Sequence, residues 1–385
     1  MARKKACIFI TRLIAGGAQK IVVDLLAHLD RAKYDLHLLV GVTDRSEPHL
    51  FDQVPSDVTV TSLDSVVREL SPKNDWIAYR QVKKFLREEA FDILHLHTSK
   101  AGVLGSMGGR GAGVPNILYT PHGHIFHKEA AIPGFTELSP LKRQILYRVR
   151  KRAYKCCHRL VALSEQDLQE QVELGLAPRE QFEVIMNGID VESFSQGDGE
   201  AVRKAFPQFR RFVGSVGRLS REKGHDILID AFAEVAKEDR EVGLFLIGSG
   251  SEEEALREQA KRLGISDQVL FTGNLPDVRG HLHSIDLFIL PSRYESQGLA
   301  AMEAMSASVP VIASRVGGVP GIIEDGETGK LFAPGNQKEL AQSIGTLLKD
   351  DSERDRLAKK GALHAQKAFS IDRMVLEYER LYDRV

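Results

Sequence analysis

Short apolar runs alternate with longer segments of helical periodicity along the whole chain. The runs are continuous and rich in β-branched residues, which is typical of strands buried on both faces of a parallel sheet. They predict strands at 7–10, 36–40, 58–61, 93–96, 116–120 and 159–162, and then at 212–216, 243–247, 269–272, 287–290 and 309–313. The amphipathic segments between them predict helices, including 19–29, 76–88, 226–236 and 253–263. The pattern indicates an α/β protein with two doubly wound parallel sheets.

Gly, Ser and Pro interrupt the apolar pattern between residues 190 and 210. Because 385 residues suffice for two domains, we expect one at 1–190 and another at 191–369. Lys and Arg number 52 against 53 for Asp and Glu, so nothing indicates a nucleic-acid partner. The balance conceals a split, because residues 1–190 carry 26 basic and 22 acidic side chains and the remainder carries 26 and 31. Any bound anion must therefore be captured locally.

The compartment is predicted from what the sequence lacks. The basic start is followed by an apolar run only from Ala6 to Ile10, whereas a signal peptide needs roughly 7 to 15 apolar residues. No run approaches the roughly 18 apolar residues of a membrane span. The three cysteines form no CxxC spacing, so neither a disulfide framework nor a thiolate metal site is expected. We expect a cytoplasmic protein.

Ligands of parallel sheets bind beyond the carboxyl ends of the strands. After the first strand, Gly16 and Gly17 allow backbone N–H groups to approach an anion, or else form a tight turn. After the fifth strand, the sequence TPHGHIFHKE contains His122, His124 and His127.

This histidine segment has three interpretations, namely a metal site, a single histidine in a cleft, or loop packing. We favour one histidine at the strand end that acts as a hydrogen-bond donor or general base. His95 and His97 lie on one face of the fourth strand, and either support that histidine or are merely structural.

The second half has the stronger signals. Arg218 and Lys223 directly follow the strand at 212–216, and a guanidinium beside an ammonium suits a diphosphate, although two cations in a solvated loop would look the same. Gly298 and Leu299 are expected to open a helix whose free N–H groups also favour phosphate.

Two glutamates flank that helix start. Glu295 lies in the loop, and Glu303 lies about 7 Å along the helix axis, a reach comparable to that from a diphosphate to a ribose. Because the two carboxylates are not expected on one face, we predict that they hold different parts of one ligand rather than form an acid–base dyad.

The sequence LFLIGSGSEEEA resembles a dinucleotide-binding fingerprint only in part. Gly248 and Gly250 are present, but Glu253 occupies the third glycine position, and consecutive glutamates stand where a pyrophosphate would bind. A nicotinamide cofactor is therefore not expected.

The ordered segments GRLSREKG, LFLIGSG, FTGNLPDV and LPSRYESQGLAAMEAMSASVPVIASRVGGVPGIIEDGETGKLF resemble the donor half of glycosyltransferase family 4, the glycosyl transferases group 1. Glu295 and Glu303 match its E-x7-E motif. The first half is similar through its GG loop, HTSKAG, PHGH and VIMNGID. The resemblance implies a retaining enzyme of the GT-B fold, with two Rossmann-like domains that face each other across a cleft.

The family's residue roles carry over position by position. Arg218 and Lys223 would bind the donor diphosphate, Glu303 the ribose and Glu295 the hydroxyls of the transferred sugar. His122 matches the cleft histidine, with His124 as the alternative. The backbone contacts to phosphate, sugar or base would come from Gly16, Gly17, Asn274, Leu275, Gly298 and Leu299. The last helix, at about 370–385, would complete the first domain.

The expected function is transfer of a sugar from a nucleotide donor, UDP-linked, to a glycan or lipid-linked acceptor in cell-surface polysaccharide synthesis. Neither a metal nor a cofactor is implied, since the cations stabilise the leaving diphosphate. The segment 141–159 has eight basic residues, including Arg150, Lys151 and Arg152, and either contacts an anionic membrane or packs on the sheet as an ordinary helix. An epimerase of the same fold and a non-catalytic nucleotide-sugar binder are the alternatives.

Overall fold

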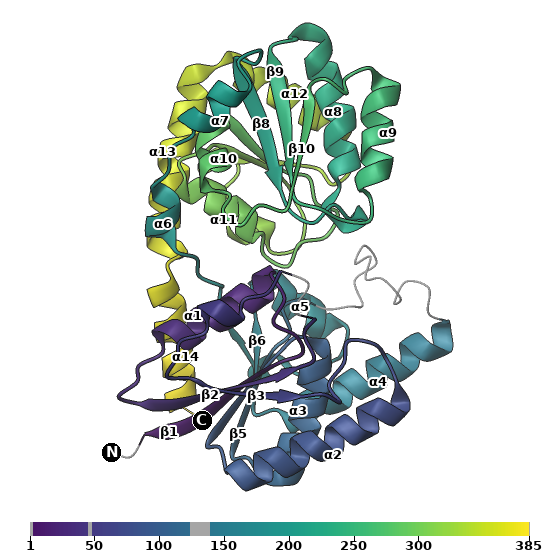
Figure 1. Cartoon of the computed structure of the whole chain (residues 1–385), viewed down its shortest axis with the longest axis vertical. Helices are drawn as coiled ribbons and strands as arrows, with labels where there is room; N and C mark the ends of the chain where they lie inside the picture. Colours follow the sequence, from purple (N-terminus) through teal and green to yellow (C-terminus); the bar gives the residue numbers. More distant parts are fainter. Residues whose placement is uncertain (1–2, 45–47, 124–138, 385) are drawn as a thin grey trace. The chain divides into compact units, whose positions relative to one another are not determined.

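The computed structural model describes residues 3–44, 48–123 and 139–384, which divide into two compact units (Figure 1). The first unit comprises the described residues up to Gly188 together with the C-terminal helix α14 (Ile371–Asp383). The second unit runs from Ile189 to Ser370. Each unit has its own parallel sheet and its own apolar core.

The sheet of the first unit is parallel and has the order β3-β2-β1-β4-β5-β6-β7. Its strands are β1 (Lys4–Ile10), β2 (Tyr34–Gly41), β3 (Thr59–Leu63), β4 (Ile93–His97), β5 (Asn116–Thr120), β6 (Arg159–Ala162) and β7 (Phe182–Val184). Helices α2 (Pro72–Glu89), α3 (Ser99–Ala112) and α4 (Pro140–Cys156) pack side by side on one face, and α1 (Gly17–His28) packs with α14 on the other (Figure 1). Both faces of the central strands are thereby buried.

Helix α14 is anchored to the first unit by apolar and polar contacts. Met374 and Leu381 are fully buried, and burial of such side chains contributes about 1.5 to 3 kcal/mol each. At the same helix, Lys33 Nζ lies 2.7 Å from Glu379 Oε2, and Lys4 Nζ donates to the carbonyl of Tyr382 at 2.9 Å. The end of the chain is therefore an integral part of the first unit.

The sheet of the second unit is also parallel, with the order β10-β9-β8-β11-β12-β13. Its strands are β8 (Arg211–Val216), β9 (Val242–Ile247), β10 (Val269–Gly273), β11 (Leu287–Leu290), β12 (Val311–Ser314) and β13 (Lys330–Phe332). On one face, Leu244 and Leu246 join the core under α8 (His225–Glu238), α9 (Glu253–Leu263) and α12 (Gln337–Lys349). On the other face, Phe245 packs edge-on against Phe206 and His281, which lie just after α7 (Glu200–Ala205) and in α10 (Arg279–Ser284).

The sequence pattern correctly predicted the α/β class, the two doubly wound sheets and every strand of four or more residues. It missed β7 and β13, which have three residues each and lie at sheet edges. Such short strands contain too few positions for an apolar run to be distinguished from a loop. Helix α9 has the predicted bounds, because its amphipathic pattern is closed by Gly264 in the left-handed conformation.

Candidate functional site

Lys223 and Glu295 form an ion pair at the carboxyl ends of two adjacent strands of the second unit. Lys223 ends a short 3-10 turn after β8, and Glu295 lies in the loop after β11, which pairs with β8. Lys223 Nζ lies 2.6 Å from Glu295 Oε2, and the Ser292 hydroxyl donates to the same oxygen at 3.2 Å. The Lys223 side chain is 26% exposed and that of Glu295 is 12% exposed. The pair is thus partly desolvated but can be reached from solvent.

Arg293 fixes the loop of Glu295 against the turn of Lys223. Its guanidinium makes two parallel bonds to Asp226, at 2.7 and 2.6 Å, and a third to the carbonyl of Arg221 at 2.9 Å. Burial alone would raise the pKa of Asp226, but the hydrogen bonds and charge of Arg293 lower it overall. The backbone N–H of Arg293 also donates to the carbonyl of Glu222 at 2.8 Å. The sequence analysis did not single out Arg293. Its bidentate guanidinium aligns the loop of Glu295 with the turn of Lys223.

Helix α11 (Leu299–Ser306) begins beside this pair, with Gly298 as its N-cap, as predicted. Ala301 and Met302 are the first residues whose N–H groups bond back to the carbonyl of Gly298. The N–H of Leu299 precedes them, so it lies among the orphan donors at the helix start, where the dipole is positive. A Cβ at Gly298, where φ is 93°, would lie 3.5 Å from Glu295 Cγ. The helix start therefore adjoins the carboxylate.

Gly317 and Gly318, in the loop after β12, pack closely against the backbone of Glu295. The sequence analysis assigned them no role. A Cβ at Gly317 would lie 1.9 Å from the carbonyl oxygen of Glu295, and φ is 47° there. Gly318 donates its N–H to that carbonyl at 3.2 Å. A pair of glycines in the loop after a strand was the available signal, because such positions often mark a close backbone approach.

The other predicted donor-site residues lie around this centre. Arg218 is 65% exposed, and its Nη1 lies 3.9 Å from Glu222 Oε1. Glu303 is half-buried within α11. Asn274 is exposed and Leu275 half-buried, and both directly follow β10. The structure thus joins Lys223, Glu295 and the start of α11 directly. Glu303 lies farther along α11, and Arg218, Asn274 and Leu275 lie in neighbouring loops of the same sheet edge.

The partial dinucleotide fingerprint is explained by packing between loops. A Cβ at Gly248 would lie 2.0 Å from the carbonyl oxygen of Gly217, and one at Gly250 would lie 2.1 Å from that of Leu219. These glycines therefore let the loop after β9 close onto the loop that carries Arg218. Helix α9 follows with acidic residues in its first turn, which satisfy the helix dipole.

Three histidines lie together in the first unit, at the carboxyl ends of β4 and β5. His97 Nδ1 lies 2.8 Å from His122 Nε2, and the two rings stack with centroids 5.1 Å apart. His95 and His97 are fully buried. Burial lowers the pKa of His95 to about 3 and that of His122 to about 4, and it also lowers the pKa of His97 well below its ordinary value. All three imidazoles are therefore neutral at neutral pH.

The remaining predicted residues of the first unit have separate surroundings. Gly16 and Gly17 are exposed at the start of α1, where Gly16 is the N-cap. His124 and His127 lie outside the described residues. Within the part of the chain that is described, no cluster of three or more histidine, cysteine or acidic side chains is placed to bind a metal ion.

Apolar residues recur at every fourth position from Leu141 along α4 to Cys157, and their burial increases along the helix. Ala153 and Cys157 are buried and Val149 is half-buried, but Leu141 and Ile145 are 67% and 50% exposed. Only the C-terminal part of the stripe therefore belongs to the core. Among the described helices, none is both long enough and apolar enough to cross a bilayer.

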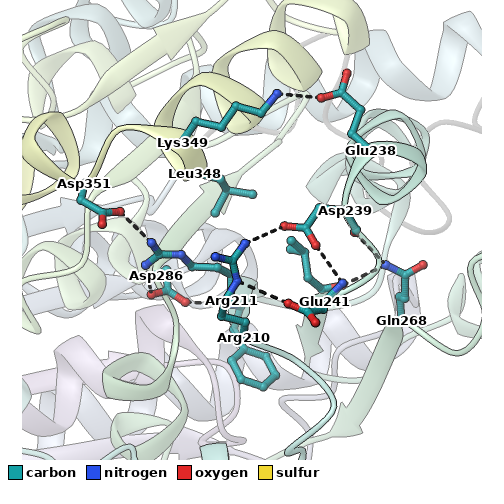
Figure 2. Close-up of polar contacts among 12 residues, drawn as sticks. Arg210, Arg211, Glu238, Asp239, Glu241, Gln268, Asp286, Leu348, Lys349 and Asp351 are labelled. Atoms are coloured by element: carbon teal, nitrogen blue, oxygen red, sulfur yellow. Dashed lines mark hydrogen bonds and ion pairs between the residues drawn. The ribbon is translucent and has the colours of Figure 1, made fainter.

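A hollow of about 330 Å³ in the second unit lies at the opposite, amino-terminal ends of β8 and β11. Arg211, at the start of β8, bonds to Asp351 at 2.7 Å and to Asp286 at 3.4 Å (Figure 2). Arg203 reaches Asp286 at 3.1 Å, and Arg354 pairs with Asp351. The aspartates of this network are neutralised by arginines, and ligands of parallel sheets bind at the other edge. We therefore assign the network a role in stabilising the fold and not in binding a ligand.

Known structures and sequences place the chain in a class. Its fold matches that of Anabaena HepE in complex with UDP and glucose, with a TM-score of 0.83 and 23% identity over all of both chains. It also matches sucrose-phosphate synthase of Thermosynechococcus elongatus, with a TM-score of 0.83 and 21% identity over 99% of each chain. Two parallel Rossmann-like units with these neighbours define the GT-B fold.

The sequence comparisons identify the family. The family described as Glycosyltransferase Family 4 matches residues 15–193, and Glycosyl transferases group 1 matches residues 200–364. D-inositol 3-phosphate glycosyltransferase of Nocardia farcinica is 32% identical over 72% of the chain, a match that spans 63% of that relative's own length. Mannosylfructose-phosphate synthase of Agrobacterium fabrum is 28% identical over 92% of the chain and 83% of that relative. The chain belongs to glycosyltransferase family 4.

Proposed function

We propose that this glycosyltransferase moves a sugar from a UDP-linked donor to its acceptor with retention of configuration. The observation that supports this most directly is the Lys223–Glu295 pair beside the first N–H groups of α11. An ammonium and a helix start attract a diphosphate, and a carboxylate accepts hydrogen bonds from sugar hydroxyls. Such a donor requires all three groups at one sheet edge.

The proposed roles of the second unit follow this chemistry. Lys223 and Arg218 bind the diphosphate, and the N–H groups at Gly298 and Leu299 assist them. Glu295 binds hydroxyls of the transferred sugar. Glu303 binds the ribose, and the backbone near Asn274 and Leu275 contacts the base.

In the first unit, His122 is proposed to contact the reacting sugar, and Gly16 and Gly17 to approach the phosphate or sugar with their backbone. Because His122 is neutral, it can offer one N–H and one bare nitrogen but no positive charge.

The reaction breaks the bond between the anomeric carbon and the β-phosphate oxygen, and the electron pair remains on that oxygen. Lys223 and Arg218 stabilise the negative charge that develops there, and loss of one such donor costs about 10² to 10³ in rate. The acceptor hydroxyl attacks from the side that the phosphate leaves, which preserves the configuration. Its proton passes to the departing phosphate, so that UDP and the glycoside are the products.

The donor proposal is tested with a panel of nucleotide sugars and detection of released UDP. UDP-linked donors should support turnover, and Arg218→Ala and Glu295→Ala should each lower it at least 100-fold. The matched control is Arg257→Ala, because Arg257 is an exposed arginine of the same unit that pairs with Glu253. Equal rates in all four proteins would contradict the proposed site. Isomerised or free sugar without an acceptor would indicate an epimerase, and binding without turnover a non-catalytic binder.

We further propose that the acceptor is a cell-surface glycan or its lipid-linked precursor, and that α4 brings the protein to an anionic membrane. The exposed Leu141 and Ile145 lie on a helix with exposed cations, an arrangement that suits a lipid surface. Arg150, part of the basic run considered from the sequence, cannot contribute, because it is buried and donates to the Tyr154 hydroxyl at 3.2 Å. The structure therefore excludes Arg150 from such a surface.

Liposome flotation tests the membrane proposal. Each cation near an anionic surface contributes about 1 kcal/mol, so replacing three should weaken binding by about 100-fold. The three exposed residues to replace are Lys142, Arg148 and Arg152. A control variant replaces three exposed cations of the second unit, Lys261, Arg262 and Lys359. The proposal would be wrong if the fraction of protein that floats with liposomes did not depend on anionic lipid. It would also be wrong if both variants lowered that fraction equally.

The relatives named for inositol phosphate and mannosylfructose phosphate favour a second acceptor class, a small phosphorylated polyol or sugar. The two classes differ in where the product is found. A lipid-linked acceptor gives product that extracts into organic solvent, whereas a phosphorylated polyol gives product that remains in water. Transfer only to soluble phosphorylated acceptors would replace the lipid-linked acceptor in the proposal.

A further inference from the structure

His97 is the buried neighbour through which the first unit holds His122. Strand β4 directs His95 and His97 to the same face, and their ring centroids are 4.0 Å apart. His122 comes two residues after β5 and has a φ of 57°, a backbone conformation that residues other than glycine rarely adopt. The contact between His97 and His122 therefore joins a rigid strand to a residue in an unusual conformation.

His95 cannot serve the same purpose, because both of its ring nitrogens are already bonded. Its Nδ1 lies 2.7 Å from the hydroxyl of Tyr382, and its Nε2 lies 2.8 Å from the hydroxyl of Thr120. Thr120 in turn lies 3.1 Å from the hydroxyl of Tyr378. Since both tyrosines belong to α14, this helix fixes the plane of His95, and His95 packs against His97. Of these two strand histidines, His97 is the one that bonds to His122.

The two nitrogens of His97 have unequal surroundings. Its Nδ1 faces His122 Nε2, whereas its Nε2 is buried and has no hydrogen-bond partner among the described residues. A neutral imidazole has one N–H and one bare nitrogen. A proton on Nε2 would therefore be a buried orphan N–H, which proteins avoid more strictly than an unmet acceptor. The proton is better placed on Nδ1, from which it is donated to His122.

We infer that His97 is a positioning residue whose Nδ1–H donates to His122 Nε2 and thereby keeps the proton of His122 on its Nδ1. This inference rests on the proposed role of His122 at the reacting sugar. In that role His122 acts as a neutral hydrogen-bond donor through Nδ1, and not as a general base, because Nε2 is already occupied. The sequence left the roles of donor and base open, and the inferred tautomer favours the donor.

Ring-nitrogen NMR of the unmodified protein tests the tautomers without any assay of activity. In protein labelled with ¹⁵N-histidine, long-range ¹H–¹⁵N spectra distinguish protonated from bare ring nitrogens. We expect His97 and His122 each to have a protonated Nδ1 and a bare Nε2, with assignments from His97→Asn and His122→Asn. A protonated Nε2 on His122 would overturn the inference. This result stands even if no nucleotide sugar supports turnover, so it separates the inference from the proposed function.

Substitutions at His97 test its positioning role. His97→Leu removes the N–H that donates to His122, but it also removes the buried ring nitrogen that has no partner. The thermal midpoint should therefore stay nearly unchanged. The kcat should fall about 10- to 100-fold, with little change in the KM for the nucleotide sugar. His97→Asn places an amide where Nδ1 was and should regain most of the lost kcat. His97→Gln places its amide at the Nε2 position and should not.

The matched control is His37→Leu. His37 is a buried histidine of β2 in the same sheet, with its Nε2 2.8 Å from the Thr61 hydroxyl. Its replacement should lower stability and leave kcat unchanged. If His97→Leu keeps its turnover, or if the Asn and Gln variants are equally impaired, the positioning role is wrong.

Discussion

If a donor diphosphate binds at Lys223 as proposed, its binding must separate Lys223 from Glu295. The ammonium lies 2.6 Å from the carboxylate, where a diphosphate would compete for it. Fully exposed ion pairs contribute about 0 to 1 kcal/mol, and breaking a buried pair costs about 3 to 5 kcal/mol. With side chains 26% and 12% exposed, this pair belongs between these limits, at about 1 to 2 kcal/mol. In the proposed site, donor binding carries that cost.

Glu295→Gln removes the cost, because a neutral amide does not hold the ammonium. UDP lacks the sugar that Glu295 would bind, so its affinity should rise about 5- to 30-fold, since 1.4 kcal/mol corresponds to a factor of ten. Sugar transfer should fall about 10- to 100-fold in the same variant, because hydrogen bonds to a charged group contribute about 1.5 to 3 kcal/mol. Opposite changes in UDP affinity and turnover are the signature of this exchange.

Titration calorimetry with UDP, beside a turnover assay, checks both effects. The control is Glu253→Gln, which removes one negative charge from the same unit, where Glu253 pairs with Arg257. It should change neither quantity by more than twofold. If Glu295→Gln weakens UDP binding, or if Glu253→Gln strengthens it equally, then Lys223 is not shared between carboxylate and diphosphate, and the reasoning fails.

The structure supports three more predictions. Gly317→Ala should lower the stability by more than about 1 kcal/mol, since its Cβ would lie 1.9 Å from the carbonyl oxygen of Glu295. It should also lower the UDP affinity measured by calorimetry. The control is Gly345→Ala, whose Cβ meets open space and which should be neutral or stabilising by up to about 1 kcal/mol. Arg354→Met should lower the free energy of unfolding, measured with urea, by about 2 to 3 kcal/mol without changing UDP affinity, because it removes the buried guanidinium that donates to the carbonyls of Leu347 and Leu348 at 2.6 and 3.0 Å. Burial lowers the pKa of His95 to about 3. The unfolded chain therefore binds the extra proton, and stability falls as the pH drops below about 6.5, by about 2 kcal/mol at pH 5. His95→Gln should flatten the pH dependence of the urea midpoint.

The sequence located the strand ends at which the proposed site residues lie, because apolar runs depend on local pattern alone. It could not reveal that Lys223 and Glu295 bond to each other, since that contact is set by Arg293 and by backbone approaches between loops far apart in the chain. Likewise, alternation along β4 placed His95 and His97 on one face, but not the contact to His122, which depends on a backbone turn with positive φ. Strand positions follow from periodicity, whereas loop contacts require the assembled sheet.

The charge split between the halves is compatible with a donor site in the more acidic one. Charges separated by more than about 8 Å are largely screened at physiological ionic strength, so net charge matters less than the nearest groups. Several acidic residues of the second unit are neutralised far along the strands from Lys223, as Arg211 shows with Asp286 and Asp351 (Figure 2). At the carboxyl ends, Arg218 and Lys223 approach from one loop beside the positive start of α11. This local arrangement therefore favours the proposed anion, even though the sequence beyond residue 190 carries more acidic than basic side chains.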